Sequence, residues 1–84
     1  MGPIFDNAQM TVVYKDHSVA CHVSLSRDQK NFVPMAAISW KSQGRLLVYF
    51  LRSNKECPNG EDANAVALEE AKLWVDRHQL NFER

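Results

Sequence analysis

The sequence predicts an α+β fold, an antiparallel sheet of three or four strands with one C-terminal helix packed on one face. Stretches rich in β-branched and aromatic residues, separated by turn formers, occupy the chain up to residue 52. After residue 59, the apolar residues recur with the period of a helix. The 84 residues, 45% of them apolar, suffice for one hydrophobic core and are too few for two. Residues 1–84 are therefore expected to form a single domain.

The first half of the chain predicts two strands. Residues 1–9 show no period, and we expect them to form a loosely ordered arm. Residues 11–14 are β-branched and aromatic, which favours a first strand. In residues 19–26, apolar side chains alternate with small or polar ones. This stretch is the clearest strand, with one face toward the core and the other toward water.

Two further strands and the helix follow. Residues 32–40 and 45–52 predict strands joined by a turn over residues 41–44, although Pro34 indicates an edge, a bulge or a strand start. Asn59 is the expected N-cap of a helix of about 18 residues, whose alanine-rich stripe allows close approach to the sheet.

Composition and charge exclude several classes of function. Ten basic residues balance ten acidic ones, whereas a dedicated nucleic-acid binder shows a basic excess. No stretch approaches the ~20 apolar residues that cross a bilayer. The start of the chain lacks the pattern of a signal peptide, so a cytoplasmic location is expected.

The residues with reactive side chains do not form a recognisable site. His17, His22 and His78 lack the spacing of a metal site, and we interpret them as structural or surface residues. Cys21 is expected in the core, whereas Cys57 is expected in an exposed loop without a paired base. The sequence therefore predicts no enzyme, no catalytic residue, no metal, no cofactor and no small-molecule ligand.

One feature does predict a function. Both strands after residue 32 carry apolar residues on both faces, yet one helix covers only one side of a small sheet. We expect the second face to carry an interaction surface, formed by Val33, Met35, Leu47, Tyr49 and Leu51. The expected partner is another protein, most simply a second copy of the chain in a homodimer. In the alternative interpretation, residues 1–10, with Ile4 and Phe5, fold over this face.

A nucleic-acid-associated function is the weaker alternative. Tyr49 lies in a predicted strand flanked by Arg45 and Arg52, as in the aromatic platforms that bind single strands.

A resemblance supports the fold. The tract Val13-Tyr14-Lys15-Asp16-His17, the strands after it, and the helical tract of residues 69–76 resemble small bacterial proteins of unknown function with a β-β-β-α layout. The chain is also distantly similar to the HicB-like antitoxin domain, which places three strands before a helix. The resemblance covers about residues 11–78 and implies a fold and no activity.

Overall fold

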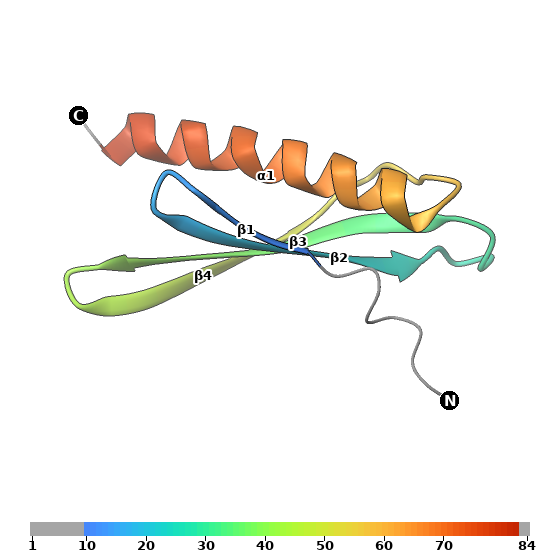
Figure 1. Cartoon of the computed structure of the whole chain (residues 1–84), viewed down its shortest axis with the longest axis horizontal. Coiled ribbons are helices and arrows are strands. Elements are labelled where there is room, and N and C mark those ends of the chain that lie inside the picture. The colour runs from blue at the N-terminus through green and yellow to red at the C-terminus, as the bar shows by residue number, and fades with distance from the viewer. Residues whose placement is uncertain (1–9, 83–84) are drawn as a thin grey trace.

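The computed structural model describes residues 10–82, which form one four-stranded sheet and one helix in two layers (Figure 1). The elements are β1 (Met10–Tyr14), β2 (His17–Leu25), β3 (Phe32–Ser42), β4 (Arg45–Arg52) and α1 (Gly60–Phe82). All neighbouring strands are antiparallel, in the order β1-β2-β3-β4. The predicted α+β fold is thus confirmed. The expected arm of residues 1–9 lies outside the described residues.

Two-residue turns fix the register of the outer hairpins. Lys15 and Asp16 (φ 50° and 64°) join β1 to β2, and Gln43 and Gly44 (φ 55° and 77°) join β3 to β4. Positive φ at both positions is the mark of a type I′ turn, whose twist matches that of the flanking strands. The second turn places Ser42 opposite Arg45 and thereby sets every pair further along β4.

The core lies between α1 and one face of the sheet. Ala63, Ala67, Ala71 and Val75 recur every four residues along α1 and are fully buried. They face a buried layer on the two central strands, formed by Val19, Cys21, Ala36 and Ile38. Because alanine is small, the helix approaches the strands closely.

The predicted cap at the start of α1 is confirmed. The backbone N–H of Asp62 donates a hydrogen bond to Asn59 Oδ1 at 2.8 Å. Before the cap, Cys57 exchanges two backbone hydrogen bonds with Phe32, each 2.8 Å long. Cys57 is only 7% exposed, so the expectation of an exposed loop cysteine is wrong. This bridge to β3 draws it into the fold.

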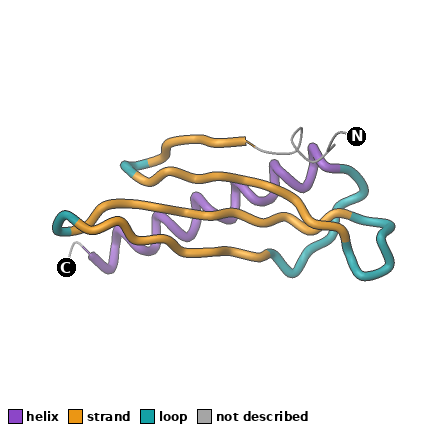
Figure 2. The backbone as a smooth tube through the Cα atoms, turned by 90° about the horizontal axis from the view of Figure 1, so that it is seen from below, coloured by secondary structure: helices purple, strands orange, loops and turns teal. Residues whose placement is uncertain are grey.

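The helix leaves one edge of the sheet uncovered. It runs obliquely across the sheet (Figure 2), lies over β2 and β3 and reaches β1. Most of β4 therefore has no helix above it, and its residues are exposed except for the half-buried Leu51.

The predicted face of β4 is wrong. Leu47, Tyr49 and Leu51 were expected beside Met35 on the face away from the helix. They instead pair with Trp40, Ile38 and Ala36, which lie on the helix side. A turn of two residues always pairs an even-numbered residue with an odd-numbered one. The side away from the helix, here called the open face, therefore receives Leu46, Val48 and Phe50 from β4.

Val33 also departs from expectation. It belongs to the open face by register, yet it is only 4% exposed. Ser53 pairs with Pro34, and the next bridge joins Phe32 to Cys57, so the intervening chain bulges beside Val33. Val33 and residues 52–56 line one small hollow, so Val33 adds almost nothing to the exposed surface of the open face.

Candidate functional site

Strand β4 carries most of the exposed large apolar side chains in residues 10–79, the range whose side-chain exposure is described. Eight large apolar residues are exposed in that range, and five of them are consecutive in β4. We call these five residues, Leu46, Leu47, Val48, Tyr49 and Phe50, the β4 surface. Phe50 is 75% exposed and Leu46 is 64% exposed. Exposed apolar residues so concentrated are typical of an interaction site.

The β4 surface has two sides. On the open face, Phe50 lies opposite Ala37, Val48 opposite Ser39, and Leu46 opposite Lys41. The large apolar side chains of this region are therefore confined to β4, and the facing residues of β3 are small or polar. On the helix side, the Tyr49 ring stacks on Trp74 of α1 at 4.5 Å between ring centroids. This ring stacking is a side-chain contact between β4 and the helix.

The strand register places the residues predicted for the site on different faces of the sheet. Met35 is half-buried on the open face, opposite Arg52. Leu47 and Tyr49 are exposed but lie on the helix side, and Leu51 packs against the core cluster. Sequence reasoning missed Leu46, Val48 and Phe50. The signal that could have identified them is the Gln43-Gly44 turn, because its length sets the face of every residue in β4.

The platform suggested for nucleic acid is not assembled. One face of the Tyr49 ring is occupied by Trp74. Arg45 lies on the helix side with Tyr49, whereas Arg52 lies on the open face. A base stacked on Tyr49 would therefore meet only one of the two arginines.

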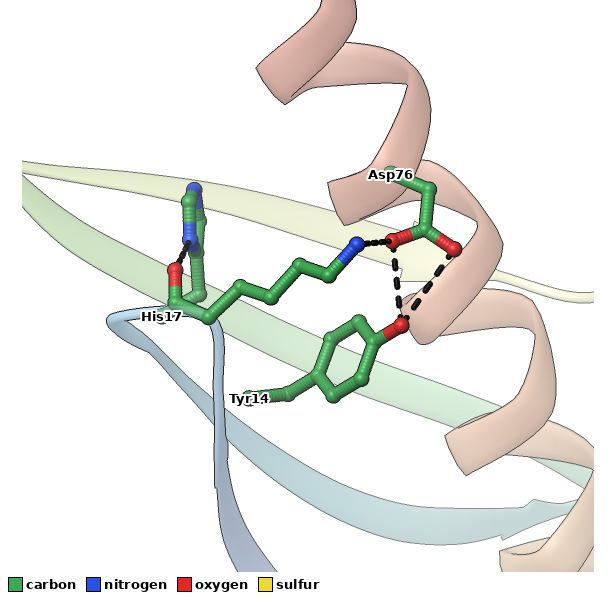
Figure 3. Close-up of polar contacts among 4 residues, drawn as sticks. Tyr14, His17 and Asp76 are labelled. Atoms are coloured by element: carbon green, nitrogen blue, oxygen red, sulfur yellow. Dashed lines mark hydrogen bonds and ion pairs between the residues drawn. The ribbon is translucent and has the colours of Figure 1, made fainter.

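A polar cluster joins the β1–β2 turn to the helix (Figure 3). Asp76 accepts hydrogen bonds from Tyr14 Oη at 3.0 Å and from Lys15 Nζ at 2.7 Å. The hydrogen bond from Lys15, followed by that from Tyr14, lowers the pKa of the Asp76 carboxyl. The same bond to Asp76 raises the pKa of Lys15. This cluster holds the helix end over the hairpin.

Beside it lies a pair of histidines that the sequence separates by 61 residues. His17 is 4% exposed, and its Nδ1 is 2.8 Å from the Lys15 carbonyl oxygen. Since a carbonyl only accepts, His17 donates from Nδ1, and its Nε2 faces His78 Nδ1 at 3.3 Å. Burial, followed by the charge of His17, lowers the pKa of His78. The sequence alone predicts only a structural or surface role for His17, since its partner becomes apparent only when the helix is folded onto the sheet.

The histidines belong to an aromatic cluster. His78 stacks on Trp74 at 4.8 Å and lies 4.7 Å from the Trp40 ring. The cluster thus runs from β2 and β3 through α1 to Tyr49 on β4. It is an extension of the core toward the β3–β4 hairpin.

The described residues carry few other candidate sites. Within residues 10–82, no three His, Cys, Asp or Glu side chains come together as metal ligands. Over the same range, no helix is long and apolar enough to cross a membrane.

Comparison of the chain with protein-family models, with curated proteins and with solved structures finds no match. The likeness to the HicB-like antitoxin domain therefore stays a prediction.

Proposed function

We propose that this protein is a non-enzymatic interaction module whose binding site is the β4 surface. The observation that carries the proposal is the exposure of five consecutive apolar residues on an edge strand. Burial of a Phe, Leu or Val side chain stabilises a complex by roughly 1.5–3 kcal/mol when burial is complete. A partner that covers β4 would gain this term from several side chains at once.

The contrast between the two sheet edges supports this site. Soluble proteins protect edge strands by shortness, charge, proline or a bulge, because an open edge pairs with other chains. Strand β1 has five residues, whereas β4 has eight. Between its terminal arginines, β4 contains no charge, no proline and no glycine. Nothing in its sequence opposes docking.

The same proposal includes a cytoplasmic location. Both cysteines, Cys21 and Cys57, are buried free thiols. Free thiols are typical of proteins in a reducing compartment.

Photo-crosslinking from two matched positions tests the proposal. A benzophenone amino acid replaces Phe50 in one sample and Val13 in the other. Both residues lie on the open face, at opposite edges of the sheet, and are 75% and 74% exposed. Purified protein is irradiated alone and in a cell lysate. We expect protein adducts from position 50, abolished by Val48→Lys, and none from position 13.

Equal adducts from both positions, or adducts from position 50 that survive Val48→Lys, would show that β4 is not a specific surface.

A further inference from the structure

We infer that the partner of β4 is a second copy of the chain, joined by antiparallel pairing of the two β4 strands. The result is a continuous eight-stranded sheet with both helices on the same side. This inference rests on the proposed function, because it assigns an occupant to the β4 surface. It adds a mode of binding in which the backbone, as well as the apolar side chains, takes part.

The outer edge of β4 presents an alternating set of backbone groups. In a two-residue hairpin, the residues that flank the turn exchange hydrogen bonds, and every second pair along the ladder does the same. Ser42 and Arg45 flank this turn, so the odd-numbered residues of β4 bond to β3. The 3.0 Å bond from Ser53 N to the Pro34 carbonyl continues that ladder. The backbone groups of Leu46, Val48 and Phe50 therefore point away from β3.

No strand within residues 10–82 lies beyond this edge, since β4 is last in the sheet order. Backbone groups point outward at the even-numbered residues of β4, and these include the three apolar residues that β4 contributes to the open face. Pairing at this edge would therefore give the free backbone N–H and C=O groups of β4 hydrogen-bond partners. It would also place side chains of the partner strand beside these apolar side chains.

This backbone pattern restricts the register of a symmetric pair. Antiparallel partners exchange both bonds, so an even-numbered residue of one β4 must lie opposite an even-numbered residue of the other. Two central registers satisfy this rule. Val48 lies opposite the partner's Val48 in one, and Tyr49 lies opposite the partner's Tyr49 in the other.

The same rule removes an electrostatic obstacle. Pairing of Arg45 with the partner's Arg52 would set like charges directly opposite each other, which is destabilising. Because one residue number is odd and the other even, no register that satisfies the edge places them opposite. The two arginines also belong to opposite faces of the sheet. The chain has a formal net charge of zero, so long-range repulsion between two copies is weak.

The exposed apolar area of β4 sets an upper limit close to the area that a specific interface needs. If a large side chain presents roughly 200 Å², the exposed fractions of the β4 surface correspond to about 500 Å² per copy. Two copies then approach the ~1,000 Å² that a specific interface requires.

Stacking of two open faces is a poorer fit. Away from β4, this face carries the apolar Val13, Ala20, Met35 and Ala37 interspersed with polar residues, namely Ser18, His22 and Ser24 from β2 and Ser39 and Lys41 from β3. Face-to-face packing would bury polar groups that then lack partners, at a cost of about 1–3 kcal/mol each. Edge pairing leaves them in water.

A proline at a β4 residue whose backbone N–H points away from β3 distinguishes edge pairing from face-to-face stacking. Val48→Pro removes a backbone donor at the free edge while leaving the bonds to β3 in place. Val13→Pro is the matched control, because the Lys15-Asp16 turn gives Val13 the same outward position on β1. Phe50→Lys removes apolar surface without removing a donor. The measurement is the molar mass by light scattering on a sizing column over a range of concentrations.

We expect the wild type and Val13→Pro to reach twice 9.6 kDa. We expect Val48→Pro and Phe50→Lys to associate at least tenfold more weakly. If Val48→Pro dimerises like the wild type while Phe50→Lys does not, strand pairing is overturned and the β4 surface remains the binding site. A wild type that is monomeric throughout overturns self-pairing. The crosslinking experiment then decides the proposed function independently.

Amide hydrogen exchange of the wild type needs no variant and covers the case in which Val48→Pro does not fold. We expect exchange at Val48 and Phe50 to slow as protein concentration rises, with no such change at Val13. Exchange at Val48 that is independent of concentration in a dimeric sample would exclude the pairing.

Discussion

At the scale of single residues, the pair formed by His17 and His78 has the clearest consequence for stability. His17 donates from Nδ1 to the Lys15 carbonyl, so its Nε2 is left as an acceptor that faces His78 Nδ1. When both rings are protonated, two N–H donors face each other across 3.3 Å. The folded state therefore resists protonation of His78.

This resistance predicts the pH dependence of stability. In the unfolded chain, His78 takes up a proton as the pH falls through its ordinary pKa of 6.5, whereas burial keeps the folded pKa lower. The unfolded state then binds more protons, so the free energy of unfolding decreases. The contribution of His78 is complete above pH 6.5 and is lost as the pH falls toward the folded pKa. Asp16, Lys41 and Gln79 border the same hollow as the two histidines.

Urea unfolding of the wild type and of His78→Gln between pH ~7.5 and ~5 measures this effect. We expect the variant to lose less stability than the wild type over this range. His22→Gln serves as the control, because His22 lies on the open face, and it should follow the wild type. The Asp28 and Asp76 carboxyls, whose pKa values lie below 3.8, lose their contributions only at lower pH. Identical slopes for the wild type and His78→Gln would show that His78 does not contribute to the pH dependence of stability.

At the scale of elements, the turns limit what sequence reasoning could predict. The alternation in β2 identifies its face directly, because one side is apolar and the other is not. Strand β4 has apolar residues at consecutive positions, so alternation carries no information about its orientation. The face of β4 depends on the two residues Gln43 and Gly44. Treating residues 41–44 as one turn hid the pairing of Ser42 with Arg45.

The helix was predicted more accurately from the sequence than the strands it packs against. Its cap at Asn59 and its alanine stripe follow from local sequence, and both are confirmed. The helix runs for 23 residues, longer than expected. The pairing of His17 with His78 could not be predicted, since it depends on which hairpin the end of the helix reaches.

The β3–β4 turn allows a direct test of the register. Gln43 is an exposed non-glycine residue at φ 55°, where asparagine is favoured. Gln43→Asn should raise the free energy of unfolding by about 0.5 kcal/mol. Gly44→Ala should lower it by about 1 kcal/mol, since φ is +77° and no atom lies within 4 Å of the added carbon. Urea denaturation measures both changes. Equal stability of Gly44→Ala and the wild type would argue against this turn and against the face assigned to β4.

At the scale of the whole molecule, the one helix in residues 10–82 covers only part of the four-stranded sheet. The helix covers β2 and β3, so the core is closed there, while β4 extends beyond it. The presence of an exposed apolar face could be predicted by comparing the number of apolar strands with the number of helices. Its residues could not, because they depend on the register. The dimer proposed here would place the exposed strand at the centre of a larger sheet.

A dimer of this kind predicts a melting temperature that depends on protein concentration. Mass action favours the paired state as concentration rises, so unfolding is displaced to higher temperature. For a chain of 84 residues that unfolds together with its partner, typical unfolding enthalpies give an increase of roughly 4 °C for each tenfold rise in concentration. Differential scanning calorimetry across two decades of concentration measures it. Phe50→Lys should abolish the dependence, whereas Val13→Lys, an equally exposed change on β1, should preserve it. A wild-type melting temperature that stays constant across that range would mean that β4 does not pair with itself.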